Sequence, residues 1–149
     1  MLRHPGARRL EELLRIEQRL GALRLDLDMM DRVGFAGSDR LRYESEAQDL
    51  SRDEASRGTE RAALVARLRA ESPDAIAEWV DAHVSALRAR LAQFERESAA
   101  GENRTTHAFV AREAIDEWEA FRRAERDDVR PNVYYIAGYA DDVLDAPSR

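Results

Sequence analysis

Proline and glycine are scarce in this sequence and gather at a few places, which leaves long uninterrupted runs between them. The first of these runs, residues 7–33, has the clearest helical periodicity in the chain. Its apolar row recurs at steps of three and four residues: Leu13, Ile16, Leu20, Leu23, Leu27 and Met30. Leu10 and Leu14 widen the row, so the pattern fits a helix that faces a globular core as well as a coiled-coil seam. The run predicts one long amphipathic helix.

The segment after this first helix divides less clearly. Residues 34–37, Gly-Phe-Ala-Gly, are predicted to end the helix, and Ser38 is of a residue type that caps the next one. Apolar residues are sparser over 39–70, and charged residues at positions 54, 57 and 61 fall on the same face. The segment is therefore compatible with two shorter helices or with one long helix whose middle is exposed.

Ser72 followed by Pro73 is typical of a helix start, because proline is favoured at the first helical position. The helix that it begins is predicted to extend to about residue 98. One face of this helix carries a continuous apolar row: Ile76, Val80, His83, Val84, Leu87, Leu91 and Phe94.

Thr105 or Thr106 can cap a fourth helix, which Arg130-Pro131 is predicted to end because the residue before proline disfavours helical geometry. The apolar face of this helix is formed by Ala111, Ala114, Ile115, Trp118 and Phe121. A short fifth helix is expected over 132–145, where apolar residues again recur at helical spacing.

No segment alternates apolar and polar residues over a sustained stretch, and β-branched residues are few, so no strand is predicted. We predict an all-α fold, an antiparallel helical bundle of four main helices plus a short C-terminal helix. A length of 149 residues suits one domain with its own core. The expected domain covers 1–149, with flexible tails at 1–6 and 146–149.

The absence of cysteine excludes disulfide frameworks, thiolate metal sites and cysteine nucleophiles, and it suits a reducing cytoplasm. The N-terminal residues lack the apolar region of a signal peptide. No stretch approaches the roughly 18 apolar residues of a membrane span. We therefore expect a cytoplasmic protein without a membrane partner.

All 24 basic residues are arginine, and the formal net charge is −6. The charge is also segregated: residues 1–24 carry six arginines against three acidic residues, whereas 25–60 carry five against ten. A basic start followed by an acidic stretch favours pairing within the chain or with another protein over a nucleic-acid footprint.

The heptad in the first helix also bears on self-association. In a parallel homodimer through this row, every flanking pair would bring together charges of like sign. These pairs are Glu12 with Glu17, Arg19 with Arg24, and Asp26 with Asp31. We therefore expect the row to pack antiparallel, either inside the domain or against a partner, and an antiparallel homo-oligomer is compatible with this.

The sequence predicts no catalytic, cofactor-binding or metal-binding residue. A di-iron helical bundle requires Glu three residues before His, but Val80 precedes His83 and Arg104 precedes His107 at that spacing. His83 lies within an apolar row, so we interpret it as a core histidine with a buried partner. Trp79 is likewise interpreted as a core anchor, as is Trp118.

Glu113, Asp116 and Glu117 resemble the helical acidic motif of all-α nucleotide pyrophosphohydrolases, which hold magnesium with clustered carboxylates. The resemblance implies a magnesium-dependent nucleotide hydrolase. That family also has a Glu-Glu-x-x-Glu run upstream, whereas here Glu11-Glu12 is followed by Arg15 at the third acidic position. Acidic residues on a helix face are otherwise simply solvated.

Residues 65–80 match the spacing of a DNA-binding helix-turn-helix, with a small residue in the first helix and a capped turn at Ser72. The helix that would read the groove carries Asp74, Glu78 and Asp81 and no basic residue, so it would repel phosphates. The basic first helix is the other candidate for nucleic-acid contact. Nucleic acid is therefore a possible partner that the pattern does not favour.

The predicted C-terminal helix offers a candidate surface for a protein partner. If the face with Val133 and Ile136 packs on the bundle, Tyr135 and Tyr139 lie one turn apart on the exposed side. Together with Tyr134 they are candidate partner contacts. The alternative is that this helix is covered on both sides within the domain.

The function expected from these features is that of a non-enzymatic helical-bundle interaction module, a subunit or regulator of a larger assembly. A nucleic-acid-associated accessory protein is the first alternative, through residues 65–80 or the basic first helix. A magnesium-dependent nucleotide hydrolase is the second alternative.

Overall fold

Five α-helices make up most of the part of the chain that the computed structural model describes, residues 2–34, 37–129, 138–139 and 143. They are α1 (Pro5–Val33), α2 (Ser38–Ser51), α3 (Glu54–Glu71), α4 (Pro73–Ala99) and α5 (Thr105–Arg122). The same residues contain no strand, so the predicted all-α class is confirmed. None of these helices is both long and apolar enough to cross a bilayer.

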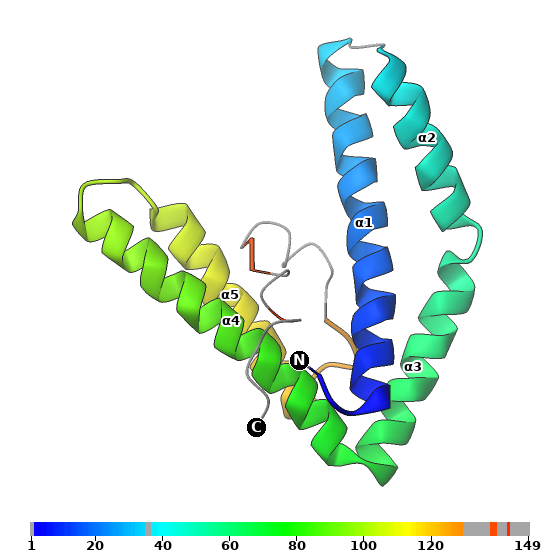
Figure 1. Ribbon diagram of the computed structural model, residues 1–149, viewed down its shortest axis with the longest axis vertical. Helices are drawn as coiled ribbons and strands as arrows, with labels where there is room; N and C mark the ends of the chain where they lie inside the picture. The colour runs from blue at the N-terminus through cyan, green and yellow to red at the C-terminus, as the bar shows by residue number, and fades with distance from the viewer. Residues whose placement is uncertain (1, 35–36, 130–137, 140–142, 144–149) are drawn as a thin grey trace.

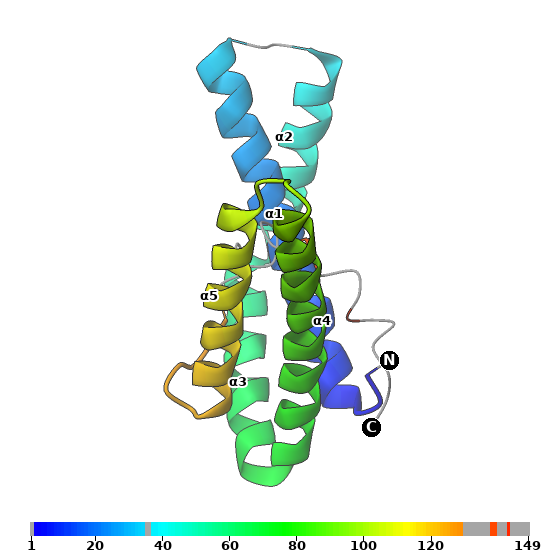
Figure 2. The same ribbon diagram turned by 90° about the vertical axis from the view of Figure 1, so that its left-hand side faces the viewer.

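The helices are arranged as two groups that meet at one end and diverge. α1 runs antiparallel to α2 and α3, which follow one another along its length, and α4 and α5 form a second antiparallel hairpin (Figure 1). The groups meet near the start of α1 and the α3–α4 junction. Figure 2 shows that the far end of α1 and α2 extends beyond the turn between α4 and α5. We call residues 20–34 and 37–51 the α1–α2 arm.

The ends of α1 have local causes. His4 is the N-cap, and its Nδ1 accepts a hydrogen bond from the backbone N–H of Gly6 at 3.0 Å, while Pro5 occupies the first helical position. At the other end Gly34 adopts a left-handed conformation with φ of 70°, and its N–H bonds back to Asp31. The predicted end of this helix at residue 33 is therefore confirmed.

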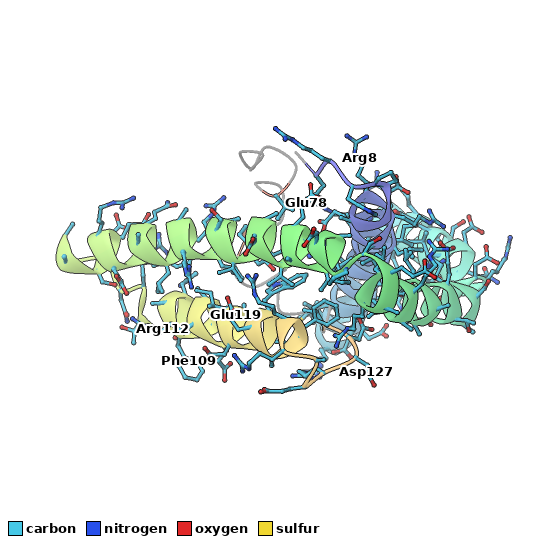
Figure 3. The ribbon with its side chains drawn as sticks, turned by 90° about the horizontal axis from the view of Figure 1, so that it is seen from below. Arg8, Glu78, Phe109, Arg112, Glu119 and Asp127 are labelled. Atoms are coloured by element: carbon cyan, nitrogen blue, oxygen red, sulfur yellow. The ribbon has the colours of Figure 1, made fainter. Side chains whose placement is uncertain are left out.

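The residues that precede α1 are packed, although we expected 1–6 to form a flexible tail. Leu2 is only 3% exposed and belongs to the main core. The backbone N–H groups of Arg3 and His4 donate hydrogen bonds to the carboxylate of Glu78 on α4. Figure 3 shows Glu78 projecting from α4 toward the chain that leads into α1, beside Arg8. Residues 2–4 thus contact the core and α4, residues 5–6 form the start of α1, and residues 146–149 lie outside the described part.

Two helices, rather than one, cover the segment 39–70. α2 ends at Ser51 and α3 begins at Glu54, so the break falls at positions 52–53 and Gly58 lies within α3. The charged residue at position 57 is accommodated because its guanidinium bonds Glu17 at 2.5 Å and the carbonyl of Leu50 at 2.7 Å. These bonds compensate the burial of Arg57 between α1 and α3.

α5 ends at Arg122, eight residues before the predicted stop at Arg130-Pro131. Ala124 takes a positive φ of 58°, and the N–H of Glu125 bonds back to the carbonyl of Ala120. The chain then returns to the core, where Val129 is buried. Arg69 on α3 fixes this turn, since its Nη2 donates to the carbonyls of Phe121 and Arg126. Tertiary contacts thus end the helix, and not proline.

The main core lies where α1, α3, α4 and α5 meet, and smaller apolar clusters continue along each group of helices. In the α1–α2 arm, Leu20 and Leu23 pack against Ala47, with Leu27, Tyr43 and Leu50 around them. The heptad row of α1 therefore packs antiparallel inside the chain, which is one of the two arrangements expected. The apolar rows predicted for α4 and α5 also line the core.

Ion pairs connect α1 to α2 and α3 along the surface. Arg9 binds Glu60 at 2.5 Å, Arg19 binds Glu46 at 2.8 Å, and Arg24 binds Glu54 at 2.8 Å. The basic start and the acidic stretch thus pair within the chain, as the charge distribution suggested. Because each pair is close to half exposed, it contributes little to stability by itself.

Gly21 and Gly6, both in α1, form a matched pair for testing this packing. A Cβ at Gly21 would meet nothing within 4 Å, so Gly21→Ala should raise the free energy of unfolding by about 0.5–1 kcal/mol. A Cβ at Gly6 would lie 2.8 Å from a methyl group of the buried Leu68, so Gly6→Ala should lower the free energy of unfolding by about 1 kcal/mol. Urea denaturation measures both. If the free energy of unfolding increased in both variants, the close approach of α1 to α3 at Gly6 would be contradicted.

Candidate functional site

Polar side chains meet inside the main core at the junction of the two groups of helices. Glu11 comes from α1, Trp79 and His83 from α4, Trp118 from α5, and Tyr139 from the segment that follows α5. We call these five residues the buried polar cluster. All are at most 4% exposed, and His83, Trp118 and Tyr139 are completely buried. Such a cluster requires specific hydrogen bonds, because a buried polar group without them is costly.

Glu11 is the acceptor at one end of the cluster. Its Oε2 accepts the indole N–H of Trp79 at 2.7 Å and lies 2.6 Å from Nε2 of His83. Its Oε1 accepts a hydrogen bond from Nε of Arg15, one turn further along α1, at 3.0 Å. The carboxylate is thereby bonded on both oxygens, and the guanidinium supplies a compensating charge.

Tyr139 lies at the other end of the cluster. Its hydroxyl accepts the indole N–H of Trp118 at 2.9 Å and lies 3.2 Å from Nδ1 of His83. The imidazole therefore bridges Tyr139 and Glu11. It also stacks on the indole of Trp118, with ring centroids 4.0 Å apart and planes inclined by 16°.

One protonation pattern gives every polar atom named here a partner. The Tyr139 hydroxyl accepts from Trp118, so its own proton can be donated to Nδ1 of His83. The neutral imidazole then carries its proton on Nε2 and donates it to Glu11. His83 is neutral in this pattern, Glu11 is ionised, and Arg15 balances its charge.

The local environment shifts the pKa values in agreement with this pattern. Burial lowers the pKa of His83 below its ordinary value of 6.5, despite the neighbouring carboxylate. Burial would raise the pKa of Glu11, but the charge interaction with His83, the hydrogen bonds from His83 and Trp79 and the charge of Arg15 together lower it below 4.5. Burial raises the pKa of Tyr139 well above 10. The cluster is thus most stable with one negative charge, on Glu11.

A pocket of about 570 Å³ lies beside the start of α1. Its lining among the described residues comprises Leu2, Arg8, Arg9, Glu11, Glu12, Arg15 and Ile16. Glu11 and Arg15 belong to this wall, but they are bonded to each other and His83 behind them has no exposed surface. The arrangement therefore suits a role in holding the helices together better than one in binding or transforming a ligand.

Sequence reasoning found part of this cluster. His83 is a core histidine with buried partners, as predicted, and the two tryptophans are core anchors. Glu11 was not identified, because nothing in the sequence separates it from the solvated acids beside it. Of the two arrangements left open for Tyr139, the structure shows the covered one: it is 0% exposed, because its ring and hydroxyl fill the space beside His83 and Trp118.

The other predicted partner contacts, Tyr134 and Tyr135, lie outside the described residues. The same holds for most of the predicted helix 132–145. Of that segment the structure describes Gly138, which has a positive φ of 67°, together with Tyr139 and Val143, and both of the latter are buried. The described fragments place part of the segment against the core.

The structure also locates the residues of the alternative functions. Glu113 and Asp116 are exposed on α5, whereas Glu117 is buried with a carboxylate oxygen 3.9 Å from Arg126. Over residues 2–34, 37–129, 138–139 and 143, no group of three or more His, Asp or Glu side chains is placed to hold a metal ion. The three acidic residues therefore do not converge on one point.

The helix-turn-helix spacing of residues 65–80 corresponds to the α3–α4 junction. Only Ser72 separates the two helices, and it makes no capping bond with its side chain. The apolar face of the segment is in the main core. Two of the three acidic residues near the start of α4 are bonded within the chain: Glu78 to the backbone before α1, and Asp81 to Arg122 at 2.5 Å. This end of α4 presents no basic side chain for phosphate.

A row of exposed apolar side chains follows the distal half of α1. Leu25, Met29 and Val33 are 48%, 52% and 72% exposed and recur every four residues. Leu23 and Leu27 face α2, and a residue two positions further along a helix points to nearly the opposite side. Leu25 and Met29 therefore lie on the face of α1 that is turned away from α2. We call these three residues the α1 stripe.

The free energy of unfolding should fall as the pH is lowered from 7 to 5. Because the pKa of His83 in the folded chain is below 6.5, the unfolded chain takes up a proton that the folded chain does not. The uptake of one such proton changes the free energy of unfolding by at most about 1.4 kcal/mol per pH unit. His83→Gln should reduce this dependence, whereas His107→Gln, on the half-buried start of α5, should leave it unchanged. Urea denaturation at several pH values between 7 and 5 measures this dependence. If the free energy of unfolding of His83→Gln varied with pH as it does in the unmodified chain, the prediction would be contradicted.

Tyr139→Phe should lower the free energy of unfolding by about 1–3 kcal/mol, because the hydrogen bonds of its hydroxyl to Trp118 and His83 are buried. Tyr43→Phe is the matched control, since Tyr43 on α2 is half-buried and its hydroxyl forms no hydrogen bond with a described residue. Its effect should stay below about 0.5 kcal/mol. Tryptophan fluorescence reports both transitions, and equal effects would show that the hydroxyl contributes nothing specific.

Comparison of the chain with protein-family models finds no match. Comparison with curated proteins and with solved structures finds none either. A function is therefore inferred from the described side chains alone. Two of their arrangements are specific enough to use, the closed polar cluster in the core and the exposed apolar stripe on α1.

Proposed function

We propose that this chain is a non-enzymatic helical interaction module, a cytoplasmic subunit or regulator of a larger assembly, which contacts another protein through the α1 stripe. The single observation that supports this is the row of three exposed large apolar side chains on α1, of which Leu25 and Met29 lie on the face opposite α2. An exposed apolar row on a helix is the feature that helix-binding partners cover.

The alignment of the stripe distinguishes it from ordinary surface exposure. Single apolar residues on a surface are common, and Leu41 on α2 and Phe109 on α5 are of that kind. Figure 3 shows Phe109 on the side of α5 turned away from α4, apart from the arm. Leu25, Met29 and Val33, in contrast, lie on consecutive turns of one helix. A partner helix can contact all three at once.

Among the residues that the structure describes, no second layer of helices covers the α1–α2 arm. Its apolar cluster is formed by side chains of α1 and α2 alone, and its distal end extends beyond the rest of the chain (Figures 1 and 2). Helical proteins stabilise such two-helix arrangements by packing further helices on their outer faces. The stripe lies where such a helix would pack.

The two alternative functions receive less support. The arginines of the basic first helix that would face nucleic acid are engaged, for example Arg9 with Glu60 and Arg19 with Glu46. The acidic residues of the nucleotide hydrolase motif divide between the surface and the core of α5. The buried polar cluster has no solvent-exposed imidazole with which to act on a substrate.

A photo-crosslinking amino acid at position 29 tests the proposal in the cells that produce the chain. Position 29 should give an adduct with another protein, whereas position 66, exposed on α3, should not. Adding Leu25→Ser and Val33→Ser should reduce the adduct severalfold, because the apolar contact is lost. Circular dichroism should show unchanged helix content, since both side chains are exposed in the free chain.

Equal adducts at positions 29 and 66 would contradict the proposal, as would an adduct that the two serine substitutions leave unchanged. An adduct with twice the mass of the chain would show that the stripe binds a second copy. The mass of the adduct is read by denaturing electrophoresis and peptide mass spectrometry.

A further inference from the structure

The charge of the α1–α2 arm, which carries the α1 stripe, indicates what kind of segment covers it. The α1–α2 arm carries four arginines and seven acidic residues, a net charge of −3. The acidic residues are Asp26, Asp28, Asp31, Asp39, Glu44, Glu46 and Asp49. Glu46 and Asp49 pair with Arg19 and Arg52, and Arg24 pairs with Glu54, so the net charge is −2 when these three partners outside the arm are counted. A surface with this surplus attracts a basic segment and repels an acidic one.

The arginines of the arm are already neutralised within the chain. Arg24 binds Glu54 at 2.8 Å, on the side of α1 that faces α3. Each of the other three binds an acidic residue of the arm itself: Arg32 with Asp28 at 3.1 Å, Arg40 with Glu44 at 2.8 Å, and Arg42 with Asp39 at 3.3 Å. No positive charge of the arm is thus left over for an acidic partner.

Asp26, in contrast, belongs to no ion pair with a described residue. It lies one turn before Met29 and borders the stripe on the side of Arg19. The guanidinium of Arg19 is engaged with both carboxylate oxygens of Glu46, at 2.8 and 2.9 Å. The carboxylate that borders the apolar row is therefore available to a cation from outside the chain.

We infer that the segment that binds the α1 stripe is a basic amphipathic helix, which lies along α1 with its apolar face on Leu25, Met29 and Val33 and its Lys or Arg side chains toward Asp26. This inference rests on the proposed function and names its partner. A second copy of this chain fits less well, because its arm would bring the same charge of −3 against this one.

Two synthetic 18-residue helical peptides with the same leucine row test this, one with lysine and one with glutamate on its polar face. The lysine peptide should bind the full chain about tenfold more tightly than the glutamate peptide at low salt, and increased salt should reduce the difference. Binding is measured by calorimetry, and amide chemical shifts of the labelled chain locate it. The shifts should concentrate in residues 22–33.

Variants of the chain separate the apolar and the electrostatic contributions. The triple variant Leu25→Ser, Met29→Ser and Val33→Ser should weaken binding of the lysine peptide by about tenfold. Its matched control, Ala62→Ser, Ala63→Ser and Ala66→Ser on the exposed face of α3, should leave binding unchanged. Asp26→Asn should weaken binding by about threefold, as expected for one exposed ion pair.

Equal binding of the two peptides would overturn the inference, and so would shifts centred on another helix or insensitivity to the triple variant. If the peptides bind equally while position 29 still crosslinks to another protein, the charge inference fails and the proposed function stands. If position 29 gives no specific adduct, the proposed function itself fails. Sedimentation that shows a dimer abolished by the triple variant would assign the stripe to a second copy instead.

Discussion

The carboxylate of Glu11 is the interaction on which the junction of the two groups of helices depends. It is buried and accepts hydrogen bonds from Trp79 and His83 of α4 as well as from Arg15 of its own helix. A buried carboxylate without these bonds would cost several kcal/mol. Rotation of α1 by one residue would replace it with Leu10 and leave the two α4 donors without their acceptor. The cluster therefore fixes how α1 and α4 face each other.

The polar and the apolar contacts are distributed unequally over the molecule. At the junction, His83 extends the network from Glu11 to Tyr139, so the segment after α5 is held by the same set of bonds. The α1–α2 arm is bonded by a buried polar group at its end near α3, where Arg57 donates to the carbonyl of Leu50. The rest of the arm depends on a small apolar cluster with exposed ion pairs around it. Exposed pairs contribute little. We therefore expect the arm to open locally before the junction does, as thinly packed elements do in native-state exchange.

The sequence indicated the helices wherever local signals decided their ends. Gly34 ended α1 and Ser72-Pro73 began α4 at the predicted positions, because a left-handed cap and an N-terminal proline act within one turn. The break at 52–53 and the end of α5 have no such signal. Ala124 adopts a positive φ because the burial of Val129 and the bonds from Arg69 offset its strain. Those contacts join distant parts of the chain, so no local pattern announces them.

The same limit applies to the candidate sites. Glu11 is separated from Trp79 by 68 residues, and only the fold brings them together. The α1 stripe, in contrast, was present in the sequence as apolar residues outside the heptad row, and the structure shows why they matter. Along the arm, α1 has two apolar faces. α2 covers the face that contains Leu23, whereas no described residue covers the face that contains Leu25 and Met29. An uncovered apolar face costs solubility without adding stability, and this cost is the physical basis of the partner that we propose for it.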